Sequence, residues 1–174
     1  MNAAATPEFV ELTAYSPLWP AVFDIEKSRL VDIFGADAVL IEHVGSTAVP
    51  GLGAKPIIDI LLGAPTLAIV DRRIPQLVET GYRHVPEFEL ANPDRRFLVK
   101  VHGHPGHLQL NAVVYDTPFW KDLLAFRDIL RGDPGLAERY WRLKNALAAR
   151  FRNDRQAYSN ARTDFIRSTL GRKA

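Results

Sequence analysis

Apolar residues recur along the chain with two different spacings, and each spacing predicts a different kind of element. The runs 39–44 and 57–62 are short and rich in β-branched residues, which is typical of buried strands. The runs 96–101 and 107–115 flank a turn rich in histidine and glycine, and together they predict an antiparallel hairpin. Weaker strand patterns lie at 8–12 and 82–85.

Helical spacing dominates the rest of the chain. Apolar residues recur at helical intervals between 16 and 34 and again between 66 and 80, where Pro75 is expected to kink or split the helix. Three further helical stripes fill 117–171, with breaks and N-caps expected at Asp133 and at Asn153-Asp154. The pattern therefore predicts an α+β fold, a mixed or antiparallel sheet with flanking helices and a C-terminal helical bundle.

We expect a single domain over residues 1–174, because the sequence contains no repeat, linker or low-complexity tract. The sheet core is expected at about 8–116 and the helical part at about 117–171. The stretch between the first two strong strands is rich in small and hydroxyl residues. Gly45-Ser46 follows a strand directly, which leaves backbone N–H groups open to an anion such as phosphate.

Asp59 interrupts the second apolar run, where a carboxylate is costly unless it is paired or binds a metal ion. Phosphate at the glycine turn and a metal ion at Asp59 is the simplest joint interpretation. Two better-known phosphate motifs are excluded by spacing, because Gly51 is followed by Leu52 and not by the Lys of a Walker loop. The dinucleotide fingerprint fails at Pro56, where it needs a third small residue.

These residues resemble the signature of the GrpB family, which is also found fused to some bacterial dephospho-CoA kinases and is grouped with the nucleotidyltransferase superfamily. The resemblance continues in the helical part, at Phe126-Arg127-Asp128, Tyr140, Lys144, Tyr158 and Phe165. It rests mainly on two stretches, Glu42-His43-Val44-Gly45-Ser46-Thr47-Ala48-Val49-Pro50-Gly51-Leu52 and Lys55-Pro56-Ile57-Ile58-Asp59-Ile60.

The resemblance implies a set of site residues, each with a simpler structural alternative that stays open. Gly45, Ser46 and Thr47 would bind phosphate, although a strand-to-helix turn capped by a hydroxyl is the alternative. Asp59 would bind Mg²⁺, or else pair with a base such as Lys55.

Other side chains are assigned in the same way. Lys55 would neutralise phosphate charge, with a solvated strand start as its alternative. His107 would act as a general acid or base, or be a hydrogen-bonded sheet histidine. Arg127 would reach a phosphate, or form only local ion pairs.

One departure from the superfamily pattern concerns its second carboxylate, which usually lies two residues after the first. Leu61 occupies that position here. Glu42 would supply the missing metal ligand if its side chain shared a sheet face with Asp59, but strand alternation allows either face.

Composition adds the distribution of charge. Residues 117–174 contain 13 Lys and Arg against 6 Asp and Glu, whereas the remainder has 9 against 14. A basic helical part attracts polyanions such as nucleotides, and RNA association is a weaker expectation. Absence of cysteine excludes thiolate chemistry, and no apolar run has membrane-spanning length, so we expect a cytoplasmic protein.

The sequence thus predicts a nucleotidyltransferase-like protein that binds a nucleotide triphosphate with Mg²⁺ and transfers a nucleotidyl group to an unknown acceptor. The alternative is a catalytically degenerate module that only binds a nucleotide or another phosphorylated ligand. The pattern sets no oligomeric state and no base preference.

Overall fold

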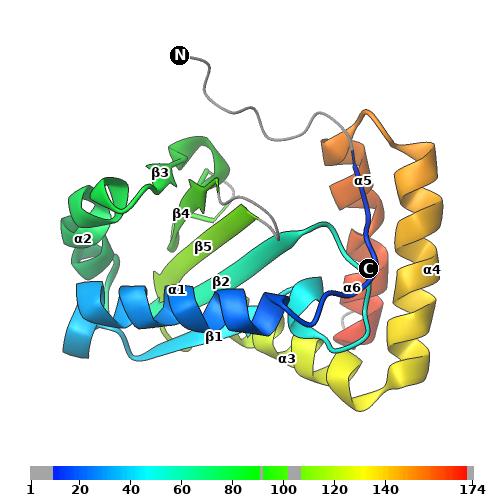
Figure 1. The fold of residues 1–174 in the computed structure, drawn as a ribbon, viewed down its shortest axis with the longest axis horizontal. Helices are drawn as coiled ribbons and strands as arrows, with labels where there is room; N and C mark the ends of the chain where they lie inside the picture. The colour runs from blue at the N-terminus through cyan, green and yellow to red at the C-terminus, as the bar shows by residue number, and fades with distance from the viewer. Residues whose placement is uncertain (1–9, 91, 102–106, 172–174) are drawn as a thin grey trace.

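The computed structural model describes residues 10–90, 92–101 and 107–171 and shows one five-stranded sheet with helices on both faces (Figure 1). The strand order is β1-β2-β5-β4-β3. The strands are β1 Leu40–Val44, β2 Ile57–Ala64, β3 Arg83–His84, β4 Arg95–Lys100 and β5 His107–Val114.

The sheet is mixed. Strands β1 and β2 pair antiparallel, β2 and β5 pair parallel, and β4 pairs antiparallel with both β3 and β5. The expected β4–β5 hairpin is confirmed, while its turn at 102–106 lies outside the described residues. The weak strand expected at 8–12 does not form over 10–12, and residues 8 and 9 lie outside the described part. Instead, Thr13 forms an isolated antiparallel bridge with Ala54.

Alternation along the strands divides the sheet into two faces. The even-numbered residues of β2, and those of β5 up to Ala112, are buried against α1 Trp19–Phe34 and α2 Leu67–Glu79. This face forms the main core of the protein. Helix α2 is continuous through Pro75. Proline has no N–H group, so the Asp71 carbonyl loses its partner in the helix. Both residues lie on the exposed side of the helix, where water can satisfy that carbonyl.

The odd-numbered face of β2 is covered by α3 Pro118–Gly132. Trp120 packs there against Val44, Leu61 and Val113. The chain then continues through α4 Pro134–Arg150, α5 Arg155–Ala161 and α6 Thr163–Thr169, which stand together beyond the end of the sheet (Figure 1). The third stripe expected in the helical part is therefore broken in two, between α5 and α6.

The expected helix caps in the C-terminal part are confirmed. Asp133 and Asp154 accept hydrogen bonds from Leu136 N and Ala157 N, at the starts of α4 and α5. The 3₁₀ helices are η1 Gly35–Asp37, η2 Ser46–Ala48 and η3 Pro86–Phe88. None of the helices in the described ranges is long and apolar enough to span a membrane.

The connection between β1 and β2, residues 45–56, packs mainly against the C-terminal helices. Val49 and Leu52 form an apolar cluster with Leu130, Ala137 and Tyr140. A side chain at Gly53 would collide with Trp141, so the connection lies directly against α4. This packing brings the glycine-rich segment, the sheet and the helical layer together at one place.

Candidate functional site

The centre of the site is the contact between Gly45 and Asp59. Val44 pairs with Asp59 across β1 and β2, so the residue after Val44 lies beside the Asp59 side chain. Gly45 has φ of +72°, and a Cβ there would collide with Asp59 Oδ2. Only glycine lets the backbone and this carboxylate lie so close, and both residues remain partly exposed to solvent.

The three-residue turn η2 follows Gly45, and the side chain of Thr47 fixes its position. Its buried hydroxyl donates to the Ile57 carbonyl at 2.9 Å, so His43 Nε2 must donate to Thr47 Oγ1 at 3.0 Å. His43 stacks on Phe23 and is neutral, because burial, aided by the charges of Arg131 and Arg127, lowers its pKa to about 4. Thr47 is therefore committed to internal hydrogen bonds, whereas Ser46 is partly exposed.

The turn does not begin an α-helix. No side chain caps η2, so the site gains little from a helix dipole. Of the expected phosphate cradle, Gly45 and Ser46 are partly exposed, and the Ser46 hydroxyl also hydrogen-bonds with the Tyr140 hydroxyl.

Three cations surround this turn. Lys55 precedes β2, Lys144 comes from α4, and Arg162 lies between α5 and α6. Burial, followed by repulsion from Arg162 and Arg155, lowers the pKa of Lys55 to about 8. Burial, followed by repulsion from Arg162 and Lys55, lowers the pKa of Lys144 to about 7, although its Nζ donates to the Gly53 carbonyl.

Two buried tyrosines, Tyr140 and Tyr158, pack against the cations. The guanidinium of Arg162 donates to Tyr140 Oη at 3.4 Å and lies 4.7 Å from the Tyr158 ring centre. Lys55 Nζ lies 5.3 Å from the same ring. Within the described chain, Tyr158 Oη and Arg162 Nε are buried and have no hydrogen-bond partner. Burial raises the pKa of Tyr158 to about 12, so its hydroxyl stays protonated.

Sequence reasoning did not assign Lys144 and Arg162 to the site, and it placed both tyrosines in core stripes. A signal was present, because each cation follows a tyrosine by four residues within a helical stripe. That spacing puts cation and ring on the same side of a helix, where a purely apolar stripe would carry another hydrophobic residue.

Asp59 is the only carboxylate among these groups. Burial raises its pKa to about 6, and attraction from Lys55 and Arg162 limits the rise. The described residues contain no group of three His, Asp or Glu side chains placed to hold a metal ion. One carboxylate flanked by cations is a poor donor set for Mg²⁺, which requires several oxygen ligands. The residues present thus do not fit a resident Mg²⁺ ion, and we derive no step through one.

The structure places Glu42 on the same sheet face as Asp59, because Glu42 pairs with Leu61 and Val44 pairs with Asp59. Its carboxylate, however, accepts a hydrogen bond from Arg127 at 2.7 Å. Arg127 is buried and also donates to the His43 carbonyl and to Asp128. Glu42 and Arg127 therefore satisfy each other and fix α3 against β1.

Two further positions named from the sequence lie near this centre. Leu61 shares the face of Asp59 but is fully buried beneath Trp120. His107 pairs with Ile57, two residues before Asp59, and therefore also lies on the Asp59 face. Gln109 pairs directly with Asp59. The Nδ1 atom of His107 is buried without a partner in the part of the chain described.

A surface hollow of about 390 Å³ lies against the other half of the glycine-rich connection, away from Asp59. Its walls are formed by residues 49–52 and by side chains of α3 and α4 that include Leu130 and Trp141. The hollow shares a loop with the site but none of its charged groups.

Comparisons with known proteins agree with this arrangement. The chain matches the family described as GrpB protein over residues 9–172. It is 34% identical over 169 residues to the glutamate-rich protein GrpB of Alkalihalophilus pseudofirmus, covering 92% of this chain and 94% of that protein. It is 37% identical over 175 residues to a UPF0157 protein of Pseudomonas aeruginosa, covering 97% of this chain and 69% of that protein.

One relative is named for an enzymatic activity. It is a dephospho-CoA kinase of Mycolicibacterium paratuberculosis and is 29% identical over 185 residues. The match covers 94% of this chain and 46% of that protein, so the expected fusion is confirmed. Among solved structures, the conserved protein GrpB of Enterococcus faecalis superimposes with a TM-score of 0.82 at 32% identity, covering 92% of this chain and 95% of that one. The signature residues, the fold and these matches show together that the chain belongs to the GrpB family.

Proposed function

We propose that this protein is a binding module for a phosphorylated small molecule, a nucleotide in particular, held at Ser46, Lys55 and Arg162. The observation that carries the proposal is the excess of positive charge at the site, where Lys55 and Arg162 act on Asp59 and Lys144 lies near both of these cations. Burial lowers the pKa values of Lys55 and Lys144, and repulsion between the cations lowers them further. A bound phosphate would supply the missing negative charge.

The surrounding groups support an anion of this kind. The Gly45 backbone has no side chain to block a close approach, and Ser46 offers a hydroxyl. Arg162 Nε and Tyr158 Oη are donors without acceptors among the described residues. Phosphate has several acceptor oxygens and forms strong charge-assisted hydrogen bonds with guanidinium groups. Occurrence of the domain in a dephospho-CoA kinase supports a nucleotide-related ligand.

Nucleotidyl transfer, the reaction implied by the superfamily, needs a metal ion to neutralise the developing charge on the phosphates. The single carboxylate Asp59 does not support that chemistry here, so we propose binding without a requirement for Mg²⁺. RNA association remains a prediction from the charge of residues 117–174, and no contact of the described residues favours it over a small ligand.

Titration calorimetry with pyrophosphate and with ATP tests the proposal, each in the presence of EDTA and of Mg²⁺. Wild-type protein is expected to bind both ligands in EDTA. Arg162→Met should weaken both by about tenfold or more, because a charge-assisted hydrogen bond is lost. Arg167→Met is the matched control, since Arg167 is exposed on α6. No binding in EDTA, or equal affinities in the two variants, would overturn the proposal.

A further inference from the structure

Several buried polar side-chain atoms of the described residues have no hydrogen-bond partner. Of the five such atoms in the described residues, Arg162 Nε and Tyr158 Oη belong to the site above, and Tyr82 Oη lies in the opposite core. The remaining two, Arg95 Nε and His107 Nδ1, belong to residues on the sheet face that carries Asp59. Unpaired buried groups in a folded protein require an explanation. Arg95 pairs with Val113 and His107 with Ile57, so the two lie at opposite ends of β5 and Arg95 requires an explanation of its own.

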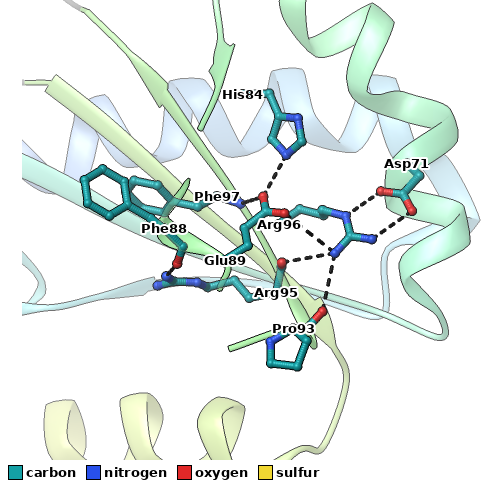
Figure 2. Close-up of polar contacts among 8 residues, drawn as sticks. All are labelled: Asp71, His84, Phe88, Glu89, Pro93, Arg95, Arg96 and Phe97. Carbon is teal, nitrogen blue, oxygen red and sulfur yellow. Dashed lines mark hydrogen bonds and ion pairs between the residues drawn. The ribbon is translucent and has the colours of Figure 1, made fainter. Parts of the chain in front are cut away.

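Arg95 differs sharply from its neighbour Arg96, as Figure 2 shows. Arg96 points toward α2, where it binds both oxygens of Asp71 at 2.6 and 3.0 Å and lies 3.7 Å from Glu89. Arg95 points the other way, toward Phe88, and donates to the Phe88 carbonyl. Within the described ranges, Arg95 forms no ion pair with a carboxylate. Glu89 acts on Arg95 only at longer range, where its charge partly offsets the effect of burial on the Arg95 pKa.

The guanidinium of Arg95 is held between aromatic rings. Its central carbon lies 5.1 Å from the ring centre of Phe97 and 5.5 Å from that of Phe119. Its Nη1 donates to Oδ1 of the buried Asn111 at 3.2 Å. These contacts fix the position of a half-buried charge but do not neutralise it, which is costly unless an anion compensates.

The register places this cation on the same sheet face as Asp59, which lies beside Gly45. Asp59 lies beside Gln109, and Asn111 follows two residues later on the same face, about 7 Å along the strand. With one strand spacing added, the Arg95 guanidinium lies on the order of 10 Å from Asp59. Gln109 and Val99 are partly exposed between the two ends, so α3 does not seal this part of the face.

We infer that Arg95, supported by Asn111, is a second anion subsite for the far end of the same ligand. The inference rests on the proposed function and narrows its ligand class. It selects phosphorylated molecules that carry a second anionic group, a carboxylate or another phosphate, on the order of 10 Å from the first. The competing explanation is that Arg95 only fixes η3 to the sheet through the Phe88 carbonyl.

A matched pair of ligands separates these two explanations. Hexylphosphonate carries one anionic end, and 6-phosphonohexanoate carries the same phosphonate with a carboxylate at the other end of the chain. Calorimetry on wild-type protein is expected to show about tenfold tighter binding of 6-phosphonohexanoate, because only its carboxylate reaches Arg95. Equal affinities of the wild type for the two phosphonates would overturn the inference without any variant.

Variants then assign the effect to the residue. Arg95→Met should bring the affinity ratio of the two phosphonates to about one while leaving hexylphosphonate and pyrophosphate binding unchanged. Arg96→Met should retain the ratio. A ratio that survives in Arg95→Met overturns the subsite. Absence of pyrophosphate binding by the wild type would instead overturn the proposed function, so the two failures are distinguishable.

Discussion

At the scale of the residue, the site is defined by a conflict of charge. Asp59 is buried enough that its pKa rises to about 6, while the nearby cations Lys55 and Lys144 are buried enough that theirs fall. Burial disfavours the charged form of each group relative to water, and the neighbouring charges do not fully offset this cost. Such arrangements reduce folding stability and are typical of functional sites that bind a ligand.

Replacing Asp59 with Asn tests this conflict. Because the pKa of Asp59 is higher in the folded state than the ordinary 3.8, its protonated form stabilises the fold at low pH, and this contribution is lost as pH rises through about 6. Asp59→Asn should therefore raise the free energy of unfolding by about 1 to 3 kcal/mol at pH 7 and have little effect below the unfolded pKa.

Urea unfolding at neutral and acidic pH measures this difference, with Asp24→Asn on the exposed side of α1 as the control. The same variant should bind pyrophosphate more tightly, because a repelling negative charge is removed. A variant that is less stable than wild type at pH 7 would contradict this account of Asp59.

At the scale of the element, the strands were the most predictable part of the molecule. Short β-branched runs identified β1 and β2 and the glycine-rich connection between them, whereas the close contact of Gly45 with Asp59 became visible only in the structure. Strand alternation alone did not decide the face of Glu42, because that depends on the register between β1 and β2. The pairing of Glu42 with Arg127 on α3 could not be predicted either, because no local pattern indicates a contact between residues so far apart in the sequence.

The helical half was harder to read for a physical reason. A stripe of apolar and aromatic residues at helical spacing looks the same whether it faces a core or forms the wall of a site. Tyr140 and Tyr158 were therefore assigned to the core, and both are indeed buried. Their role appears only when Arg162 and Lys55 are placed against them by the packing of α4 and α5 on the connection.

Leu61 shows how an element limits the chemistry of the site. The i+2 position after Asp59 has the face expected for a second metal-binding carboxylate, but α3 covers it with Trp120. Leu61→Asp should therefore lower the free energy of unfolding by about 3 kcal/mol or more, since a carboxylate would be buried without a partner. Leu61→Met should cost less than about 1.5 kcal/mol. Thermal unfolding with and without Mg²⁺ measures both, and stabilisation of Leu61→Asp by Mg²⁺ would show that the position does reach a metal site.

At the scale of the whole molecule, the site exists only because two layers meet. The sheet supplies Asp59, the connection supplies Gly45, Ser46 and Lys55, and the C-terminal helical part supplies Lys144, Arg162 and the two tyrosines. Part of the basic charge of residues 117–174 is thus located at this site, next to the more acidic residues 1–116. Ligand binding should tighten the contact between the layers, because both contribute to the same anion.

Binding should also take up protons, and this follows from the signs of the lysine shifts. The pKa values of Lys55 and Lys144 are about 8 and about 7 in the free protein, so at pH 8 both are partly neutral. An anion bound beside them favours their charged forms and raises both pKa values, which requires protons from the solvent. Since the unfolded chain binds more protons between pH 7 and 10.5, the free protein should also become more stable as pH rises through this range.

ATP is a suitable ligand for the measurement, because its phosphates are already ionised at pH 8. Calorimetric titration in two buffers of different ionisation enthalpy should show uptake of about one proton per ATP bound. Lys55→Gln should reduce the uptake, whereas Lys121→Gln on the exposed start of α3 should not. Binding heats that are independent of the buffer would mean that the lysines do not change protonation.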